Sequence, residues 1–117
     1  MSFSQKDIKL NGWAFESRIY AEDPYKGFLP SIGRLTKYSP PSEDKSMDYE
    51  IRNDTGVKEG DEISIFYDPM IAKLSTWGKD RKSAIRFMEK ALDEFCISGL
   101  KNNVSFLSSI YLNPKFV

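Results

Sequence analysis

The spacing of the apolar residues changes along the chain, and this change limits the possible folds more than any other sequence feature. Between residues 12 and 20, apolar and polar side chains alternate with the period of two that is typical of a half-buried strand. From residue 85 to residue 95, the apolar residues instead recur every three or four positions, as in an amphipathic helix. The sequence therefore predicts strands first and helices last.

Turn-forming residues divide the first two thirds of the chain into short strands. Prolines and glycines bound a loop over 25–33, and a polar, proline-containing segment predicts another loop over 39–48. A bend over 57–63, with Gly60 able to adopt a positive φ, opens a strand through Tyr67. We expect further strands at three places: 34–38, 49–54 and 70–77. The result is roughly five or six antiparallel strands before the helices.

Two helices are predicted at the C-terminal end of the chain. Asp80 is a suitable N-cap for the first helix, and Gly99 follows its last apolar residue, where a left-handed residue is common. The second helix covers 104–112, with Asn102 or Asn103 as its cap. Strands followed by helices indicate an α+β fold.

Length and charge narrow the choice of function. The chain has 117 residues without an internal repeat or a domain boundary, so we expect one domain over 1–117. Its 17 basic residues balance 17 acidic ones, which gives no electrostatic reason to expect nucleic acid or an anionic membrane as a partner. No apolar run is long enough to span a membrane.

The sequence contains no histidine, and this excludes imidazole bases, Ser–His and Cys–His pairs and most zinc sites. No metal site is predicted. Cys96, the single cysteine, cannot form an internal disulfide, which fits a reducing compartment, and we expect it to be packed inside the first helix. A phosphate-binding glycine loop is also absent from the sequence, so a self-contained nucleotide site is not expected.

Arg18 is the strongest candidate for chemistry. The alternation over residues 12–20 places it in mid-strand, on the same face as Glu16 and Tyr20. An ion pair on a solvated sheet surface is the simpler interpretation of this pattern. The functional interpretation is a fixed guanidinium aimed at an anion, because arginine stays charged and presents a rigid fork of donors.

Other charged positions have ordinary structural interpretations. Asp68, before Pro69, is typical of a turn, although its carboxylate could instead orient an arginine. Lys73 is typical of a strand lysine whose aliphatic stem packs on apolar surface. Glu22 and Asp23 point to opposite faces and precede a proline, so local capping is expected of them rather than magnesium binding.

Several segments, taken in order, resemble the biotin carboxylase C-terminal domain. They are 16–24 (ESRIYAEDP), 28–33 (FLPSIG), 54–57 (DTGV), 59–64 (EGDEIS), 67–74 (YDPMIAKL), 78–81 (GKDR) and 103–107 (NVSFL). The resemblance extends over residues 7–116. Within the family, the segments 24–26 (PYK) and 30–35 (PSIGRL) look most like acyl-CoA carboxylase α subunits, above all those of propionyl-CoA carboxylase.

The resemblance implies both a fold and a mechanism. The family fold is an antiparallel, barrel-sandwich-like sheet with C-terminal helices. Biotin carboxylases use ATP, magnesium (Mg²⁺) and bicarbonate to make carboxyphosphate, and then carboxylate biotin that is carried on a separate domain. Arg18 matches the family arginine beside the ureido oxygen of biotin, where negative charge builds when N1 loses its proton. The resemblance therefore implies a catalytic role for Arg18, since a preorganised cation at that place stabilises the transition state.

The same resemblance suggests roles for four more residues. Asp68 matches a family aspartate at the biotin end of the site, and we expect it to orient a basic residue from the other lobe. Glu16 is grouped with it on the biotin side. Arg52 and Tyr49 match positions that contribute to dimerisation in bacterial biotin carboxylase subunits, so both are candidates for a subunit interface.

The resemblance also identifies what lies outside this sequence. In the family, the sites for ATP, magnesium and bicarbonate lie in preceding ATP-grasp regions, so this chain alone is not expected to turn over ATP. The expected partners are the ATP-grasp lobe of the same subunit, a biotin carrier domain and a carboxyltransferase subunit. The implied location is the cytoplasm in a bacterium or the mitochondrial matrix in a eukaryote.

Two other interpretations remain open at this point. One is a carrier domain of the biotinyl or lipoyl type, in which Lys73 near Met70 would be the modified lysine. The other is an interaction module that has the same fold and no catalytic role.

Overall fold

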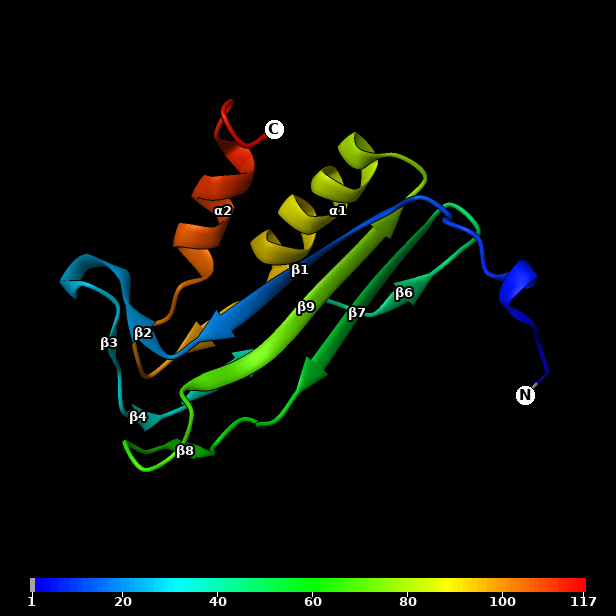
Figure 1. The fold of residues 1–117 in the computed structure, drawn as a ribbon. Coiled ribbons are helices and arrows are strands. Elements are labelled where there is room, and N and C mark those ends of the chain that lie inside the picture. The colour runs from blue at the N-terminus through cyan, green and yellow to red at the C-terminus, as the bar shows by residue number, and fades with distance from the viewer. Residues whose placement is uncertain (1) are drawn as a thin grey trace.

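Strand β9 (Met70–Gly78) is the centre of the fold because it pairs along both of its edges. The computed structural model describes residues 2–117, and Figure 1 shows its arrangement. β1 (Trp13–Tyr20) and β7 (Tyr49–Thr55) lie antiparallel to β9 on opposite sides. β6 (Asp44–Lys45) pairs with the free edge of β7, which gives a four-stranded sheet in the order β1-β9-β7-β6.

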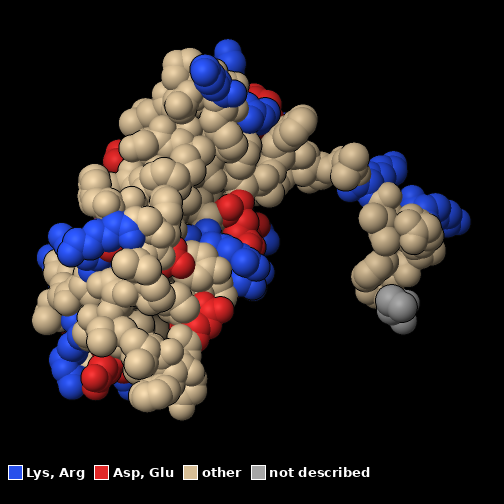
Figure 2. Space-filling model, turned by 60° about the vertical axis from the view of Figure 1, so that its left-hand side comes forward, with Lys and Arg blue, Asp and Glu red and all other residues tan. Residues whose placement is uncertain are grey.

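Short elements extend from one end of this sheet. Residues 2–117 form three two-stranded antiparallel ribbons: β2 (Glu22–Asp23) with β3 (Leu29–Pro30), β4 (Gly33–Arg34) with β8 (Glu62–Ile63), and β5 (Lys37–Ser39) with β10 (Cys96–Ser98). The described part of the chain also has two 3₁₀ helices, η1 (Gln5–Asp7) and η2 (Pro24–Lys26). In Figure 2 the N-terminal segment extends as an arm away from the body of the molecule.

The two α-helices cover one face of the sheet. α1 (Arg81–Glu94) packs on β9, β1 and β7, and α2 (Val104–Leu112) packs on α1 and β1. The apolar residues of the sheet and of α1 meet between these layers: Ile19, Ile51, Leu74, Ile85, Met88 and Leu92. Within the described residues, the opposite face of the sheet carries no helix (Figure 1). From Ala72 to Gly78, buried and half-buried residues alternate along β9, as in a strand with one face against the core.

The structure confirms the antiparallel α+β fold and most of the predicted elements. Asp80 caps α1, since its carboxylate accepts a hydrogen bond from the backbone N–H of Ser83 at 2.7 Å. Asp23 caps η2 by accepting from the N–H of Tyr25 at 3.0 Å, as the capping interpretation requires. The bend at Gly60 has a φ of 92°. Met1, the first residue of the domain predicted over 1–117, lies outside the described residues.

Three local predictions were wrong. Gly99 does not end the first helix: α1 ends at Glu94, Phe95 is its C-cap, and β10 separates both from Gly99. The strand predicted through Tyr67 ends at Ile63, because β4 offers it a partner over only two residues. A turn follows, in which Ser64 Oγ accepts from the N–H of Phe66, and the aromatic side chains there are exposed. Cys96 does not belong to the helix; it begins β10 and is only half-buried.

Gly99 connects β10 to α2 at a point where the backbone of another segment passes very close. Its φ is 103°, and a methyl group at this position would overlap the carbonyl oxygen of Arg34 and lie 2.8 Å from the backbone nitrogen of Thr36. Gly27 also has a positive φ, of 66°, but a methyl group there meets nothing within 4 Å. The two glycines therefore separate backbone strain from steric overlap.

We expect Gly99→Ala to destabilise the chain by about 3 kcal/mol or more, since strain and overlap add, and Gly27→Ala by about 1–2 kcal/mol from strain alone. Urea unfolding followed by tryptophan fluorescence measures both values. Equal losses of stability in the two variants would show that the close approach at Gly99 is absent.

Candidate functional site

The face of the sheet that has no helix carries charged side chains in cross-strand rows. Arg18 on β1 is opposite Lys73 on β9, which is in turn opposite Asp54 on β7. In the adjacent row, Glu16 and Arg52 lie on either side of a serine of β9. Basic and acidic side chains also lie next to one another on the side of the body seen in Figure 2. We call this face of the sheet, which carries Glu16, Arg18, Arg52, Asp54 and Lys73, the open face.

Arg18 lies on the open face as the alternation predicts, together with Glu16 and Tyr20. Its Nε is 4.0 Å from Oε1 of Glu16, and its Nη1 donates to the hydroxyl of Tyr20 at 3.4 Å. Both contacts are long, and 59% of the Arg18 side chain is exposed. The contact to Tyr20 is a hydrogen bond and the one to Glu16 is an ion pair too long to be one, so the side chain retains donors for an incoming acceptor.

The backbone beneath Arg18 is held from the side that faces away from β9. Asn103, at the start of α2, donates from Nδ2 to the carbonyl oxygen of Arg18 at 3.0 Å. Its Oδ1 accepts from the backbone N–H of Tyr20 at 2.8 Å. Sequence analysis identified Asn103 only as a possible cap, but the side chain that accepts the N–H of Val104 is that of Asn102, at 3.1 Å. The sequence has no signal for the contact to β1, because 85 residues separate the bonded pair.

Asp68 lies in the exposed loop between β8 and β9. Its Oδ1 accepts a hydrogen bond from the backbone N–H of Met70 at 2.8 Å, which is the turn geometry expected of an aspartate before proline. Glu16 is beside Arg18, whereas within the described residues Asp68 forms no hydrogen bond or ion pair with either of them. The structure thus brings together two of the three residues expected on the biotin side.

Tyr49 and Arg52 lie on opposite faces of β7. The ring of Tyr49 stacks on Phe87 of α1, with 4.6 Å between centroids, while the Arg52 side chain lies on the open face. Arg52 Nε donates to Oδ1 of Asp54 at 2.8 Å, and this bond raises the pKa of Arg52. The hydrogen bond from the Tyr49 hydroxyl to Asp44 raises the pKa of Tyr49. The interface role of the pair stays a prediction.

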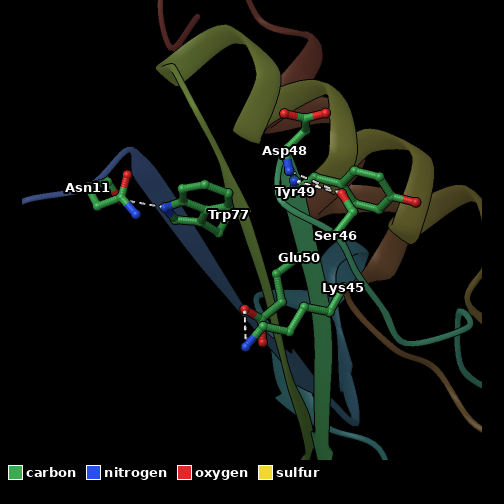
Figure 3. Close-up of polar contacts among 7 residues, drawn as sticks. All are labelled: Asn11, Lys45, Ser46, Asp48, Tyr49, Glu50 and Trp77. Atoms are coloured by element: carbon green, nitrogen blue, oxygen red, sulfur yellow. Dashed lines mark hydrogen bonds and ion pairs between the residues drawn. The ribbon is translucent and has the colours of Figure 1, made fainter.

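The end of the open face farthest from Arg18 is shown in Figure 3. The indole N–H of Trp77 donates to the backbone oxygen of Asn11 at 2.6 Å, which fixes the start of β1. Lys45 and Glu50 form an exposed ion pair of 3.5 Å across β6 and β7. Ser46 accepts hydrogen bonds from two backbone N–H groups in the turn between these strands. These contacts stabilise the β6–β7 hairpin and the start of β1, so we assign them a structural role.

Sequence and fold both match one protein family. Residues 16–117 match the family described as the biotin carboxylase C-terminal domain. The chain belongs to this family. The resemblance identified from the sequence segments is therefore confirmed, as is the α+β fold that it implies.

Named relatives of this biotin carboxylase C-terminal domain are much longer chains. It is 52% identical to the propionyl-CoA carboxylase alpha chain of Ruegeria pomeroyi, over 100% of this chain and 19% of that relative. It is 49% identical to the mitochondrial propionyl-CoA carboxylase alpha chain of Homo sapiens, over 97% of this chain and 15% of that relative. The chain thus spans less than one fifth of the length of these two relatives.

Crystal structures give the same result. A biotin carboxylase β,γ-ATP complex from Campylobacter jejuni superposes with a TM-score of 0.88 at 43% identity, over 99% of this chain and 25% of that one. The biotin carboxylase domain of a thermophilic 2-oxoglutarate carboxylase bound to bicarbonate superposes with a TM-score of 0.87 at 37% identity, over the same shares of the two chains.

The position of Lys73 does not fit a carrier domain. A carrier lysine belongs in a tight exposed hairpin, whereas Lys73 is a half-buried residue in the middle of the nine-residue strand β9. Residues 2–117 contain no group of three or more His, Cys, Asp or Glu side chains placed to hold a metal ion. No helix in the described part of this biotin carboxylase C-terminal domain has the length and apolar composition needed to cross a membrane.

The raised pKa of Tyr49 gives a prediction about pH. Because the folded protein holds the phenolic proton more tightly than the unfolded chain, this bond contributes stability below the ordinary tyrosine pKa of about 10. The contribution is lost as the pH rises through the folded pKa. Asp44→Asn removes the main cause of the shift, so the pKa of Tyr49 should fall toward its ordinary value and the alkaline loss of stability that this group causes should become smaller.

NMR titration of ¹³C-labelled tyrosine measures this pKa directly. Asp48→Asn is the matched control, because Asp48 is the chain neighbour of Tyr49 but pairs with Lys79 instead. A pKa of Tyr49 that is the same in wild type and in Asp44→Asn would contradict the assignment of the hydrogen bond.

Proposed function

We propose that this domain supplies the biotin-facing side of the active site in a larger biotin-dependent carboxylase subunit. The observation that carries the proposal is the placement of Arg18. Its guanidinium is exposed on the open face, yet the backbone beneath it is bonded to β9 on one side and to Asn103 on the other. A cation that is accessible and also held in place is suited to an acceptor on which negative charge develops.

The chemical task assigned to Arg18 is charge stabilisation. Biotin supplies a ureido group whose N1 accepts the carboxyl group and whose oxygen gains negative charge in the process. Arg18 would donate hydrogen bonds from its guanidinium to that oxygen, and its positive charge would stabilise the negative charge that develops there. Lys73, directly across the ladder, adds a second positive charge to the same row of the open face.

Glu16 and Asp68 have supporting roles in this proposal. Glu16, 4.0 Å from Arg18, limits the directions that the guanidinium can take, and its distance leaves the cation free to bond elsewhere. Asp68 holds the turn before β9 through the N–H of Met70 and keeps a second carboxylate oxygen for a basic residue from another lobe.

The remaining chemistry belongs to other parts of the proposed subunit. ATP, magnesium and bicarbonate would be bound by an ATP-grasp lobe, which fits the long relatives and the ATP and bicarbonate complexes that this domain resembles. The described residues provide no ready ligand set for magnesium. A biotin carrier domain and a carboxyltransferase subunit complete the proposed assembly.

Propionyl-CoA carboxylase is the whole enzyme that the comparisons favour, since named relatives at about half identity are its alpha chains. Such an enzyme would lie in the cytoplasm of a bacterium or in the mitochondrial matrix of a eukaryote. Arg52, which bonds to Asp54 on the open face, is the better placed of the two candidate interface residues, because Tyr49 packs on the helix side.

The test compares two reactions of the full-length subunit carrying Arg18→Ala. Carboxylation of biotin should fall about 100- to 1,000-fold, as for the loss of one preorganised donor to a developing oxyanion. Bicarbonate-dependent ATP hydrolysis, which reports carboxyphosphate formation, should be retained. Arg86→Ala is the matched control, since Arg86 is an exposed arginine on α1, away from the open face, and should leave both reactions unchanged.

Wild-type biotin carboxylation in Arg18→Ala would overturn the proposed role of this residue. The chain would then be better described as an interaction module that keeps the fold without the chemistry. Loss of both reactions together would instead place Arg18 in the ATP-dependent step. It would contradict the proposal that Arg18 acts in biotin carboxylation and not in carboxyphosphate formation.

A further inference from the structure

β1 is an edge strand, and Asn103, which lies outside the sheet, hydrogen-bonds to the edge of β1 that faces away from β9. The strand order β1-β9-β7-β6 leaves the far side of β1 without a neighbouring strand. Asn103 makes three hydrogen bonds to this side: its backbone N–H to the Tyr20 oxygen at 3.2 Å, its Oδ1 from the Tyr20 N–H at 2.8 Å, and its Nδ2 to the Arg18 oxygen at 3.0 Å. A single residue thus replaces a partner strand for the segment 18–20.

The place of these bonds coincides with an irregularity in the ladder. The register between β1 and β9 shifts between Ile19 and Tyr20, one residue beyond Arg18. A bulge disrupts the ladder locally and re-aims the side chains beside it, so pairing to β9 alone fixes this segment less well than the rest of β1. The bonds from Asn103 span the irregularity and fix the backbone on both sides of it.

Burial makes these bonds costly to lose. Asn103 is only 7% exposed, and its amide uses both the oxygen and the nitrogen on β1. Its side chain does not cap α2, and among the described residues its side-chain hydrogen bonds go to β1 alone. A buried amide whose oxygen and nitrogen both bond to the strand carrying Arg18 is placed to control the direction of that side chain.

The rest of α2 is tied to the same strand independently. At the other end of the helix, the Tyr111 hydroxyl lies 2.9 Å from Oγ of Ser17, and both groups are buried. Figure 1 shows the beginning of α2 beside the end of β1. Loss of the Asn103 side chain would therefore free the segment 18–20 locally, while Tyr111 and the backbone N–H of Asn103 keep α2 docked.

We propose that Asn103 is a positioning residue that holds the β1 backbone so that Arg18 points at the reacting group. This inference rests on the proposed function of Arg18 and extends it by one residue. A misplacement of about 1 Å at a reacting centre can reduce a rate about 100-fold. Asn103 does not touch the reacting group; it acts through the backbone of Arg18 and Tyr20.

The experiment uses the full-length subunit with Asn103→Ala. We expect kcat for biotin carboxylation to fall about 10- to 100-fold with little change in KM, because Arg18 acts in the transition state. Bicarbonate-dependent ATP hydrolysis should stay within about twofold of wild type. The matched control is Thr76→Val, which removes one buried hydrogen bond, from Oγ1 to the Ala84 oxygen at 2.9 Å, on the helix side of the sheet. It should lower thermal stability without changing either reaction.

Asn103→Asp adds a rescue measurement that a general loss of stability would not produce. A carboxylate keeps the acceptor for the Tyr20 N–H but turns a lone pair toward the Arg18 oxygen, so this variant should be slow at neutral pH. Protonation of the carboxyl group restores a donor. Its rate relative to wild type at the same pH should therefore rise as the pH falls, and that of Asn103→Ala should not.

The outcomes separate this inference from the proposal on which it rests. If Arg18→Ala abolishes biotin carboxylation and Asn103→Ala has wild-type kcat, the positioning role is wrong and the role of Arg18 stands. Equal loss of both reactions in Asn103→Ala, or the same loss in Thr76→Val, would reduce Asn103 to a structural residue. If Arg18→Ala is itself fully active, the proposed function fails first.

Discussion

The double pairing of β9 is the constraint on which the rest of the structure depends. Because β1 and β7 hydrogen-bond to its two edges, the residues of β9 from Ala72 onward have fixed sides: one set of side chains enters the core and the other lies on the open face. Leu74 belongs to the first set and Lys73 to the second. The core and the candidate site are therefore the two faces of one sheet, separated only by the thickness of its backbone.

This arrangement explains how an exposed arginine can still be well oriented. The helices bury the residues on either side of Arg18, namely Ser17 and Ile19, and so anchor β1 by its opposite face. Asn103 then fixes the free edge at the point where the ladder to β9 is irregular. Arg18 gains a rigid base without being buried, and an exposed guanidinium avoids the desolvation cost of a buried charge.

Much of this was predictable from the sequence because it depends on local periodicity. The period-two alternation placed Glu16 and Arg18 on one face, and the helical spacing together with Asp80 located α1. The separation of Tyr49 from Arg52 was also predictable, since residues three apart on a strand point to opposite faces. The family segments then supplied the chemistry that periodicity alone could not.

The rest could not be predicted because it depends on contacts between distant parts of the chain. The strand expected through Tyr67 had the right composition, but only the fold decides that no partner strand reaches it beyond Ile63. Likewise, nothing near Asn103 in the sequence indicates that its amide will bond to Arg18 and Tyr20 rather than cap a helix. Whether Asp68 orients a basic residue depends on a lobe outside this chain.

The most direct measurement of the central claim is a crystal structure of the full-length subunit with biotin bound. The account predicts a guanidinium nitrogen of Arg18 within about 2.7–3.2 Å of the ureido oxygen, with the bonds from Asn103 to β1 retained. A ureido oxygen bound by other groups, with Arg18 turned to solvent, would contradict it.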